Sequence, residues 1–489
     1  MVRFLILTLF LMTVVDGRFL KRNKTKTDPA QNLQAFLKNA VNVGGLEQIQ
    51  KMENVRSKLG AFRKTVHQKN VSTTASSKAK KIQAKRREDD EEPVDTIADI
   101  NRGLEQFLFD GDIMLDAKQA NQLNNKRGKR QAYSSSTARW PKDSPIPYYI
   151  DSTIDNASAS LILDAVNFWQ SHTCLSFKVD STVSPRVKFT KGTGCSSYVG
   201  RVTTMDEQEV SIGDRCSYFG IIAHEIAHVL GIFHHQSRTD RDDFVEIVWD
   251  NIPAEWTDNL AIQTLSNNYN TSYEYGSVMH YAEKITESDA IQILAKDSRY
   301  QRSMGNRDTP TFSDVLVVNR YYDCASACNT TITCSNGGYQ NPANCSQCVC
   351  PGGFGGKDCS TVASPEFGAT NCGGILKAST VWQTLVGKVG ENSSTVYPRQ
   401  KACHWHIQAP AQTKISLKID YIRGPCSLGC YYGSTEIKLG NFTLTGVRLC
   451  CSSDVPANSQ FVTDGNLAVI SAHTQLATEK FSIQYKILA

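Results

Sequence analysis

Apolar and polar residues follow three different patterns along the 489-residue chain. After Met1-Val2-Arg3, the apolar run 4–15 is too short to span a bilayer and predicts a signal peptide over residues 1–17. Residues 157–171 place Leu161, Ala165 and Phe168 on one face of a helix. Beyond residue 372, short runs such as 414–421 and 467–471 alternate apolar and polar residues, which predicts an all-β sandwich.

Residues 18–130 contain no cysteine and few aromatic side chains. Short helices are expected around residues 33–41 and 46–59. The charge blocks and small polar residues of segment 73–92 bury too little apolar surface to fold alone. The region ends in Lys126-Arg127-Gly128-Lys129-Arg130, the spacing that furin-like convertases cleave. These features predict a propeptide over residues 18–130, cut between Arg130 and Gln131.

Charge and cysteine content also change at this boundary. Residues 18–130 carry 24 basic and 14 acidic side chains, whereas residues 131–489 carry 28 basic and 33 acidic ones. This balance gives no support to a nucleic-acid partner. All 16 cysteines lie at or after Cys174, which predicts disulfides and an oxidising, extracellular location. No later stretch reaches eighteen apolar residues, so we expect a secreted protein without a membrane span.

The segment after the boundary predicts an α+β domain with a metal site. Residues 140–150 lead into a strand, residues 187–190 form another, and two helices accompany them. On the second helix, His224 and His228 are four residues apart and therefore share a face, with Glu225 beside them. Gly231 allows the chain to leave the helix and bring in His234 as a third ligand. Three protein ligands leave zinc an open position for water.

A methionine turn follows 45 residues after His234, in Ser277-Val278-Met279-His280-Tyr281. The extended zinc motif with Gly231 and His234 describes the metzincin class of peptidases. With the continuation Gln236–Asp242 and this form of the turn, the sequence resembles the astacin family of zinc metalloendopeptidases. The resemblance implies a metzincin catalytic domain with a zinc cleft over residues 131–324.

The same resemblance implies a role for each matching residue. His224, His228 and His234 would bind one Zn²⁺, Glu225 would act as general base, and Tyr281 would be an additional ligand that swings away during turnover. Zinc lowers the pKa of bound water toward about 7, and a nearby carboxylate takes the proton as the water attacks the scissile carbonyl. The carboxylate then passes that proton to the leaving amine.

A latency motif and one departure from the family accompany this site. Phe109-Asp110-Gly111-Asp112 resembles the motif by which astacin zymogens place an aspartate on zinc, so Asp112 is the expected inhibitory ligand. His235 stands where the family usually has a glutamate that pairs with the new N-terminus. Gln131 can cyclise and lose its charge. We therefore hypothesise that a different contact orders the N-terminal segment of the mature chain.

The spacing of the remaining cysteines resembles two further modules, an EGF-like domain over residues 325–360 and, after a linker at 361–371, a CUB domain over residues 372–489. Residues alone leave three pairings open for the four cysteines of the catalytic domain. By resemblance, the expected bridges of the three domains are Cys174–Cys324, Cys195–Cys216, Cys328–Cys345, Cys334–Cys348, Cys350–Cys359 and Cys372–Cys403. Cys450 and Cys451 are each expected to reach back to Cys426 or Cys430, and neither module shows a calcium site.

Further candidates concern modification and specificity. Arg302 is a candidate for the S1′ pocket, against the commoner explanation of a solvated basic loop. Eight Asn-X-Ser/Thr sequons are candidate glycosylation sites: Asn23, Asn70, Asn156, Asn270, Asn329, Asn344, Asn392 and Asn441.

Two classes of function follow. One is a secreted, zymogen-activated zinc endopeptidase acting on extracellular proteins, with cuticle or matrix collagen and moulting or hatching substrates as candidates by analogy with nematode-type astacins. The other is a catalytically silent EGF-CUB adhesion scaffold. A furin-like convertase would activate the enzyme, and the EGF-like and CUB modules are candidates for binding matrix or cell-surface partners. The complete set of ligands, base, methionine and tyrosine favours the enzyme.

Overall fold

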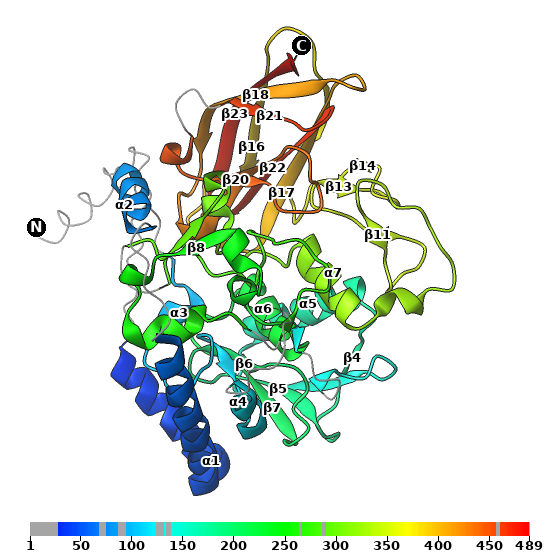
Figure 1. The fold of residues 1–489 in the computed structure, drawn as a ribbon. Coiled ribbons are helices and arrows are strands. Elements are labelled where there is room, and N and C mark those ends of the chain that lie inside the picture. Colours follow the sequence, from blue (N-terminus) through cyan, green and yellow to red (C-terminus); the bar gives the residue numbers. More distant parts are fainter. Residues whose placement is uncertain are drawn as a thin grey trace, which may run out of the picture.

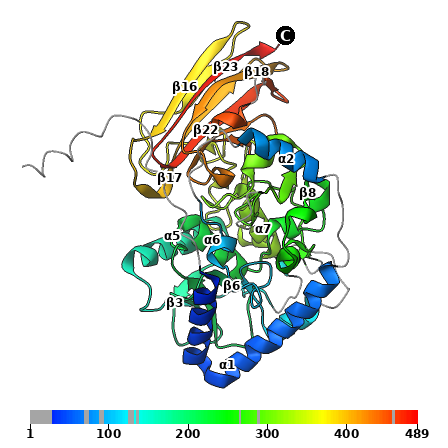
Figure 2. The same cartoon turned by 90° about the vertical axis from the view of Figure 1, so that its left-hand side faces the viewer.

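The structure is a computed structural model that describes residues 28–67, 75–86, 94–123, 132–133, 138–263, 266–285, 290–455 and 460–488. The predicted signal peptide (1–17), Asn23, Asn70, Arg130 and Gln131 lie outside these residues. An α+β unit forms the lower part of the molecule in Figure 1, and a β-sandwich stands above it. The N-terminal helices lie along the α+β unit, as Figure 2 shows from the side.

A six-stranded sheet forms the centre of the α+β unit. Its strand order is β1-β6-β7-β5-β3-β4. All neighbours run parallel except the antiparallel pair β6 and β7. The strands are β1 (Ile113–Met114), β3 (Ile146–Ile150), β4 (Phe177–Val179), β5 (Arg186–Thr190), β6 (Cys195–Tyr198) and β7 (Glu207–Ile212). The strands predicted near residues 150 and 187 are confirmed as β3 and β5.

Two helices, α5 (Asn156–His172) and α6 (Phe219–Val229), share the core of this unit. Asp155 caps α5 by accepting the Ser158 backbone N–H at 2.9 Å. The predicted helix is confirmed, but its buried face is centred differently. Ile162, Ala165 and Trp169 are fully buried, whereas Leu161 and Phe168 are only partly buried. The Trp169 indole donates to the Ala223 carbonyl of α6 at 3.1 Å.

The N-terminal segment, residues 28–123, contributes α1 (Pro29–His67), α2 (Ala75–Arg86), α3 (Ile97–Ile100), β1 and α4 (Ala117–Leu123). Two short helices were expected near its start, but one helical run covers both, and Figure 2 shows it bent. Gly44 and Gly45 lie between the two expected helices, and glycine pairs are a usual cause of kinks.

Segment 73–92 was expected to bury too little apolar surface to fold alone, and its residues 75–86 form α2 against another part of the chain. Ala75 and Ala79 are buried against Val248, Ile291 and Leu294 of the α+β unit. The helix therefore gains from another part of the chain the apolar contacts that its own sequence does not supply.

The chain beyond residue 324 forms a disulfide-rich segment and then a sandwich. The first contains the short strands β11 (Tyr339–Gln340) to β14 (Thr361–Val362). The sandwich pairs a five-stranded sheet with a four-stranded one around Ile407, Leu417, Ile470 and Phe481. The strands of the sandwich are β15 (Gly374–Lys377), β16 (Gln383–Gly390), β17 (Val396–Gln408), β18 (Lys414–Arg423), β19 (Gly433–Lys438), β20 (Val447–Leu449), β21 (Gln460–Val462), β22 (Leu467–Leu476) and β23 (Thr478–Leu488).

All 16 cysteines are paired in the structure. The α+β unit holds 174–324 and 195–216, and the disulfide-rich segment holds 328–345, 334–348 and 350–359. The sandwich holds 372–403, 426–451 and 430–450. These include the six pairs implied by the family resemblance, and Cys450 and Cys451 each reach back as expected. The six sequon asparagines within the described residues, Asn156, Asn270, Asn329, Asn344, Asn392 and Asn441, are all exposed.

The sandwich docks on the α+β unit through buried polar contacts. The Glu274 carboxylate accepts the Thr445 N–H at 2.9 Å, and the Ser303 hydroxyl donates to the Gly446 carbonyl at 3.1 Å. The Arg302 guanidinium forms an ion pair with Asp454 at 2.9 Å, with both side chains 3% exposed. Arg302 is therefore neither a solvated loop residue nor open to substrate. The predicted pocket role is wrong because its guanidinium is bound to the sandwich.

Within the described part of the chain, no helix has both the length and the apolar character needed to cross a bilayer.

The buried Arg302–Asp454 pair is expected to hold the sandwich in place. Arg302→Ala leaves a buried carboxylate without its cation and should lower the stability of the folded chain by about 3 kcal/mol. Urea unfolding followed by intrinsic fluorescence measures this loss. Arg299→Ala is the matched control, because its pair with Asp297 is exposed and should change stability by less than about 0.5 kcal/mol. Equal losses in both variants would contradict the assignment.

Candidate metal centre

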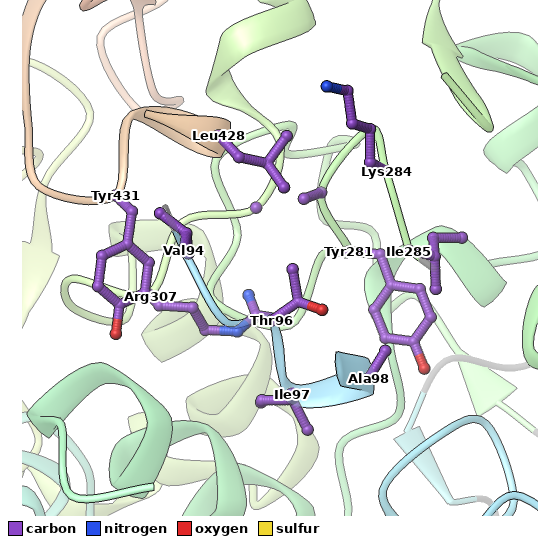
Figure 3. A pocket seen from close by; sticks show the side chains of 12 residues that line it. Val94, Thr96, Ile97, Ala98, Tyr281, Lys284, Ile285, Arg307, Leu428 and Tyr431 are labelled. Carbon is purple, nitrogen blue, oxygen red and sulfur yellow. The ribbon is translucent and has the colours of Figure 1, made fainter. Parts of the chain in front are cut away.

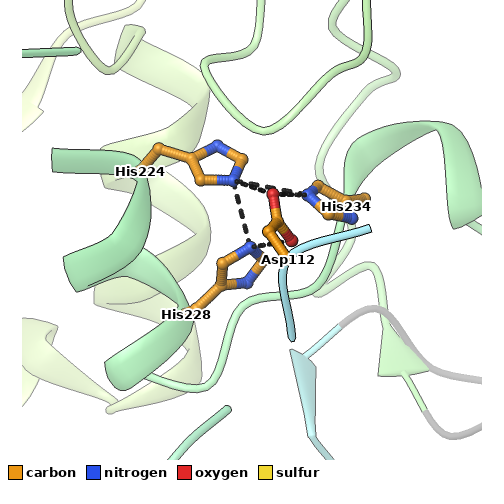
Figure 4. A group of neighbouring side chains, drawn as sticks. All are labelled: Asp112, His224, His228 and His234. Atoms are coloured by element: carbon orange, nitrogen blue, oxygen red, sulfur yellow. Dashed lines mark hydrogen bonds and ion pairs between the residues drawn. The ribbon is translucent and has the colours of Figure 1, made fainter. Parts of the chain in front are cut away.

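The helix α6 positions two histidines of the site, and the turn after it positions the third. All residues of α6 are buried, and His224 and His228 extend from one face (Figure 4). The helix ends at Leu230, and Gly231 adopts a φ of +95°. A Cβ atom at Gly231 would lie 2.9 Å from the Tyr321 ring, so both space and conformation require glycine there. This turn brings His234 back to the helix.

The three imidazoles meet one carboxylate from the N-terminal segment. Asp112 Oδ2 lies 3.2 Å from Nε2 of His224 and 3.2 Å from Nε2 of His234. Asp112 Oδ1 lies 3.3 Å from Nε2 of His228. The Nε2 atom of His224 lies 3.1 Å from that of His228 and 3.3 Å from that of His234. These four side chains form a candidate metal group (Figure 4).

These separations fit a tetrahedral zinc site. Four atoms held about 2.0–2.1 Å from one ion in a tetrahedron lie roughly 3.4 Å apart. The observed separations of 3.1–3.3 Å are close to that value. Three neutral imidazoles and one carboxylate are also a donor set that zinc accepts.

Backbone and side-chain acceptors orient the imidazoles from outside. Nδ1 of His224 lies 2.8 Å from the Val278 carbonyl, and Nδ1 of His228 lies 2.7 Å from the Ile232 carbonyl. Nδ1 of His234 lies 3.0 Å from Asp110 Oδ2. These contacts direct each Nε2 toward the centre, as outer partners do in metal sites. Asp110 is a contributor that sequence reasoning missed, although it lies inside the Phe-x-Gly-Asp motif.

Burial sets the charge state of the centre. It lowers the pKa of His224 to about 3 and also lowers the pKa of His228, so both imidazoles are neutral. Burial opposes protonation of His234 as well, but the Asp112 and Asp110 carboxylates outweigh it and raise the pKa to about 10. Burial raises the pKa of Asp112, yet the facing imidazoles hold it well below its usual range. Asp112 is therefore ionised, and its pairing with His234 shows that a positive charge, either a proton or a metal ion, is favoured among these nitrogens.

Glu225 lies next to the metal group and is fully buried. The Ser197 hydroxyl donates to its Oε2 at 2.8 Å. The other oxygen, Oε1, has no hydrogen-bond partner among the residues that the structure describes. Burial, and then the charge of Asp112, raises the pKa of Glu225 well above its usual range. A buried carboxylate with one oxygen held and the other without a hydrogen-bond partner among the described residues is placed to take a proton and return it.

The N-terminal segment delivers Asp112 through strand pairing. β1 pairs with β6, and the Ser197 N–H donates to the Asp112 carbonyl at 3.1 Å. The Asn101 side-chain amide bridges the Gly111 and Cys195 carbonyls at 2.9 and 2.6 Å. A Cβ atom at Gly111, whose φ is +86°, would lie 2.3 Å from the Tyr281 hydroxyl. The motif glycine therefore lets the chain pass between Tyr281 and the metal group.

Tyr281 and Met279 belong to the turn that lies beside the metal group. The Tyr281 ring centroid lies 4.7 Å from that of His234, and its hydroxyl donates to the Asp110 carbonyl. Burial raises the pKa of Tyr281 well above its usual range, so the hydroxyl is a neutral donor in this arrangement. Met279 is buried, and its carbonyl accepts the His235 N–H at 2.9 Å. Asp314 holds the turn by accepting the Val278 N–H at 2.9 Å, a contact that the sequence did not reveal.

His235 is buried beside the metal group but is not part of it. Its Nε2 accepts the Glu274 N–H at 2.8 Å, so the ring supports the turn segment. The hypothesis of a different N-terminal contact remains a hypothesis, because Gln131 lies outside the described residues. Directly after Gln131 in the sequence, β2 (Ala132–Tyr133) pairs with β9 (Ser266–Asn267).

A second possible metal group, Cys430, Cys450 and Asp454, lies in the sandwich. The two cysteines form a disulfide, so they offer no thiolate to a metal.

Comparison with known proteins identifies relatives of the chain. The family model of Astacin (Peptidase family M12A) matches residues 132–323. Zinc metalloproteinase nas-27 of Caenorhabditis elegans is 36% identical over 405 residues, which cover 79% of this chain and 92% of that protein. Zinc metalloproteinase nas-28 of the same organism is 35% identical over 403 residues, covering 79% and 80%. Among solved structures, High choriolytic enzyme 1, a hatching enzyme zinc-protease from Oryzias latipes, is 32% identical, covers 39% of this chain and 96% of its own, and has a TM-score of 0.36.

The site geometry and these relatives agree on zinc chemistry at one centre. Three imidazoles with a buried glutamate form a metalloprotease arrangement, and the relatives that span most of the chain are zinc metalloproteinases. The chain therefore belongs to the astacin family, peptidase family M12A, and is a zinc metalloendopeptidase.

Proposed function

We propose that the protein is a secreted, zymogen-activated endopeptidase that cleaves extracellular proteins. Residues 1–17 are the signal peptide, 18–130 the propeptide and 131–324 the catalytic domain. Residues 325–360 form an EGF-like domain, 361–371 a linker and 372–489 a CUB domain. The disulfide pairs and exposed sequon asparagines support an extracellular location. Candidate substrates are matrix or cuticle collagen and proteins degraded in moulting or hatching.

In the proposed mechanism, His224, His228 and His234 hold one Zn²⁺, which supplies Lewis-acid catalysis when bound. Glu225 takes a proton from the attacking water at its Oε1 and returns it to the leaving amine. Ser197 keeps the carboxylate in place through its bond to Oε2. Tyr281 loses its acceptor when Asp110 departs, so its hydroxyl becomes available to donate to the developing oxyanion.

The position of Asp112 supports the proposal that the enzyme is latent before its propeptide is removed. Its carboxylate lies within 3.3 Å of all three Nε2 atoms and occupies the position that water needs. Cleavage after Arg130 by a furin-like convertase would release the segment. The catalytically silent adhesion scaffold is not favoured, because the ligands and Glu225 are all in place. Matrix or cell-surface binding by the EGF-like and CUB modules remains a proposal beside the peptidase activity.

The first prediction concerns the zinc ligands. His234→Gln should weaken zinc binding at least about 100-fold because one ligand is lost. His235→Gln is the neighbouring control, since the glutamine oxygen can still accept the Glu274 N–H. It should retain one zinc per chain. Zinc content measured by mass spectrometry after dialysis against a chelator tests this. Retention by His234→Gln together with loss by His235→Gln would reverse the ligand assignment.

The second prediction concerns the base. After convertase treatment, Glu225→Gln should lower kcat on a quenched-peptide library by about 10²–10⁴-fold while zinc content stays unchanged. Removing zinc with a chelator should abolish cleavage by the wild type. Glu391→Gln, at an exposed position of the sandwich, should leave kcat unchanged. If wild type loaded with zinc cuts no peptide, the scaffold function takes the place of this proposal.

The third prediction concerns latency. In a chain made uncleavable by Arg130→Ala, adding Asp112→Ala should raise cleavage of a short peptide at least about tenfold, because a ligand position is opened. The matched control is Asp116→Ala, which removes a carboxylate that bonds to Thr204 and Gln119 rather than to the histidines. It should remain latent. Equal activity of the two variants would show that the whole segment, and not Asp112, blocks the site.

A further inference from the structure

A cavity lies where three parts of the chain meet, next to the metal centre. It is lined by Val94, Thr96, Ile97 and Ala98 of the N-terminal segment, by Tyr281 and Arg307 of the catalytic domain, and by Leu428 and Tyr431 of the sandwich (Figure 3). Tyr281 links this cavity to the metal group, because its hydroxyl donates to the carbonyl of Asp110, two residues before Asp112. The sandwich therefore forms part of the wall of a space that begins at the catalytic tyrosine.

The segment Val94–Ala98 forms one wall of this cavity and contacts both the sandwich and the catalytic domain; we call it the occupant of the groove between those two parts. Val94 is buried in an apolar cluster with Tyr431, Tyr432 and Leu476 of the sandwich. At the other end, Ala98 packs in the cluster that contains Tyr281.

Between these two ends, the Asp95 carboxylate lies 3.2 Å from the Arg215 guanidinium. Arg215 stands four residues before α6. The occupant thus presents an apolar side chain to the sandwich and an acidic one to the start of the metal-binding helix.

The walls of the groove do not depend on this occupant. Thr445 and Glu274, Gly446 and Ser303, and Asp454 and Arg302 join the sandwich directly to the catalytic domain. The Arg399 guanidinium also lies 3.4 Å from the centroid of the Phe219 ring, at the first residue of α6. When residues 18–130 leave, Leu428 and Tyr431 therefore keep their place and become accessible.

We propose that Leu428 and Tyr431 form a substrate subsite that opens when the propeptide leaves. It takes an apolar side chain of an extended protein substrate, and Arg215 takes an acidic side chain next to it. This inference rests on the proposed activation by propeptide removal. The CUB module is then a direct determinant of which protein segments are cut, because it supplies part of the cleft wall.

The test compares short and extended peptides on the activated, zinc-loaded enzyme. The short quenched peptide covers only the residues next to the scissile bond. The extended peptides carry a Val-Asp pair about four to eight residues away, on either side of the bond. In the wild type, at least one extended peptide should have a kcat/KM about tenfold above the short one, since filling an apolar pocket gives selectivity of that order.

Tyr431→Ala should remove this tenfold ratio, mainly through KM. Tyr431→Phe should preserve it, because the ring supplies the apolar surface. Tyr421→Ala is the matched control on β18, where the ring contacts Arg423 of the same strand, and it should also preserve the ratio. Arg215→Ala should lower kcat/KM for the Val-Asp peptide and not for its Val-Asn counterpart.

Two results would overturn the proposed subsite. One is a wild-type kcat/KM for every extended peptide that is close to that of the short peptide. The other is an equal loss of kcat/KM on short and extended peptides in Tyr431→Ala. The peptidase activity itself is judged separately, on the short peptide. If the wild type cleaves the short peptide and Glu225→Gln does not, the proposed function is supported even when the extended peptides show no higher kcat/KM than the short one.

Discussion

The convergence of three buried imidazoles on one point is the constraint on which the rest of the structure depends. Imidazole nitrogens that face each other and a carboxylate at 3.1–3.3 Å in a desolvated site need a cation among them. Helix α6, the turn at Gly231, the Met279 turn and the strand pairing of β1 all hold groups around that point. The α6 residues and Met279 are buried in the core of the α+β unit, so packing maintains the geometry of the ligands.

Asp112 meets this constraint from outside the catalytic domain. It lies directly before β1, which adds a strand to the edge of the sheet beside β6. Strand addition supplies backbone hydrogen bonds for any sequence, while Gly111 and Asp112 supply the specific fit. This arrangement explains how a segment without a core of its own occupies a defined place. Its apolar side chains, such as Leu59 and Phe109, are buried in a cluster shared with Val199 and Phe233.

The sandwich, the third part of the chain, is also held by contacts close to the metal ligands. Its buried ion pair at Arg302 and its hydrogen bond to Glu274 place it against the segments that follow and precede the methionine turn. Glu274 connects the docking surface to His235 through its own backbone N–H. A family difference at position 235 and the position of an accessory module are thus parts of one contact network beside the metal ligands.

The sequence by itself determined the local chemistry and the order of the parts. Helical spacing places His224 and His228 on one face, cysteine positions separate the modules, and alternation indicates the sandwich, because these patterns depend only on neighbouring residues. Tertiary structure decided everything that depends on distant contacts. It made residues 75–86 helical, placed Arg302 against Asp454, and brought Asp110 and Ser197 to the metal centre. Burial and pairing between residues far apart in the sequence set these outcomes, and no local pattern encodes them.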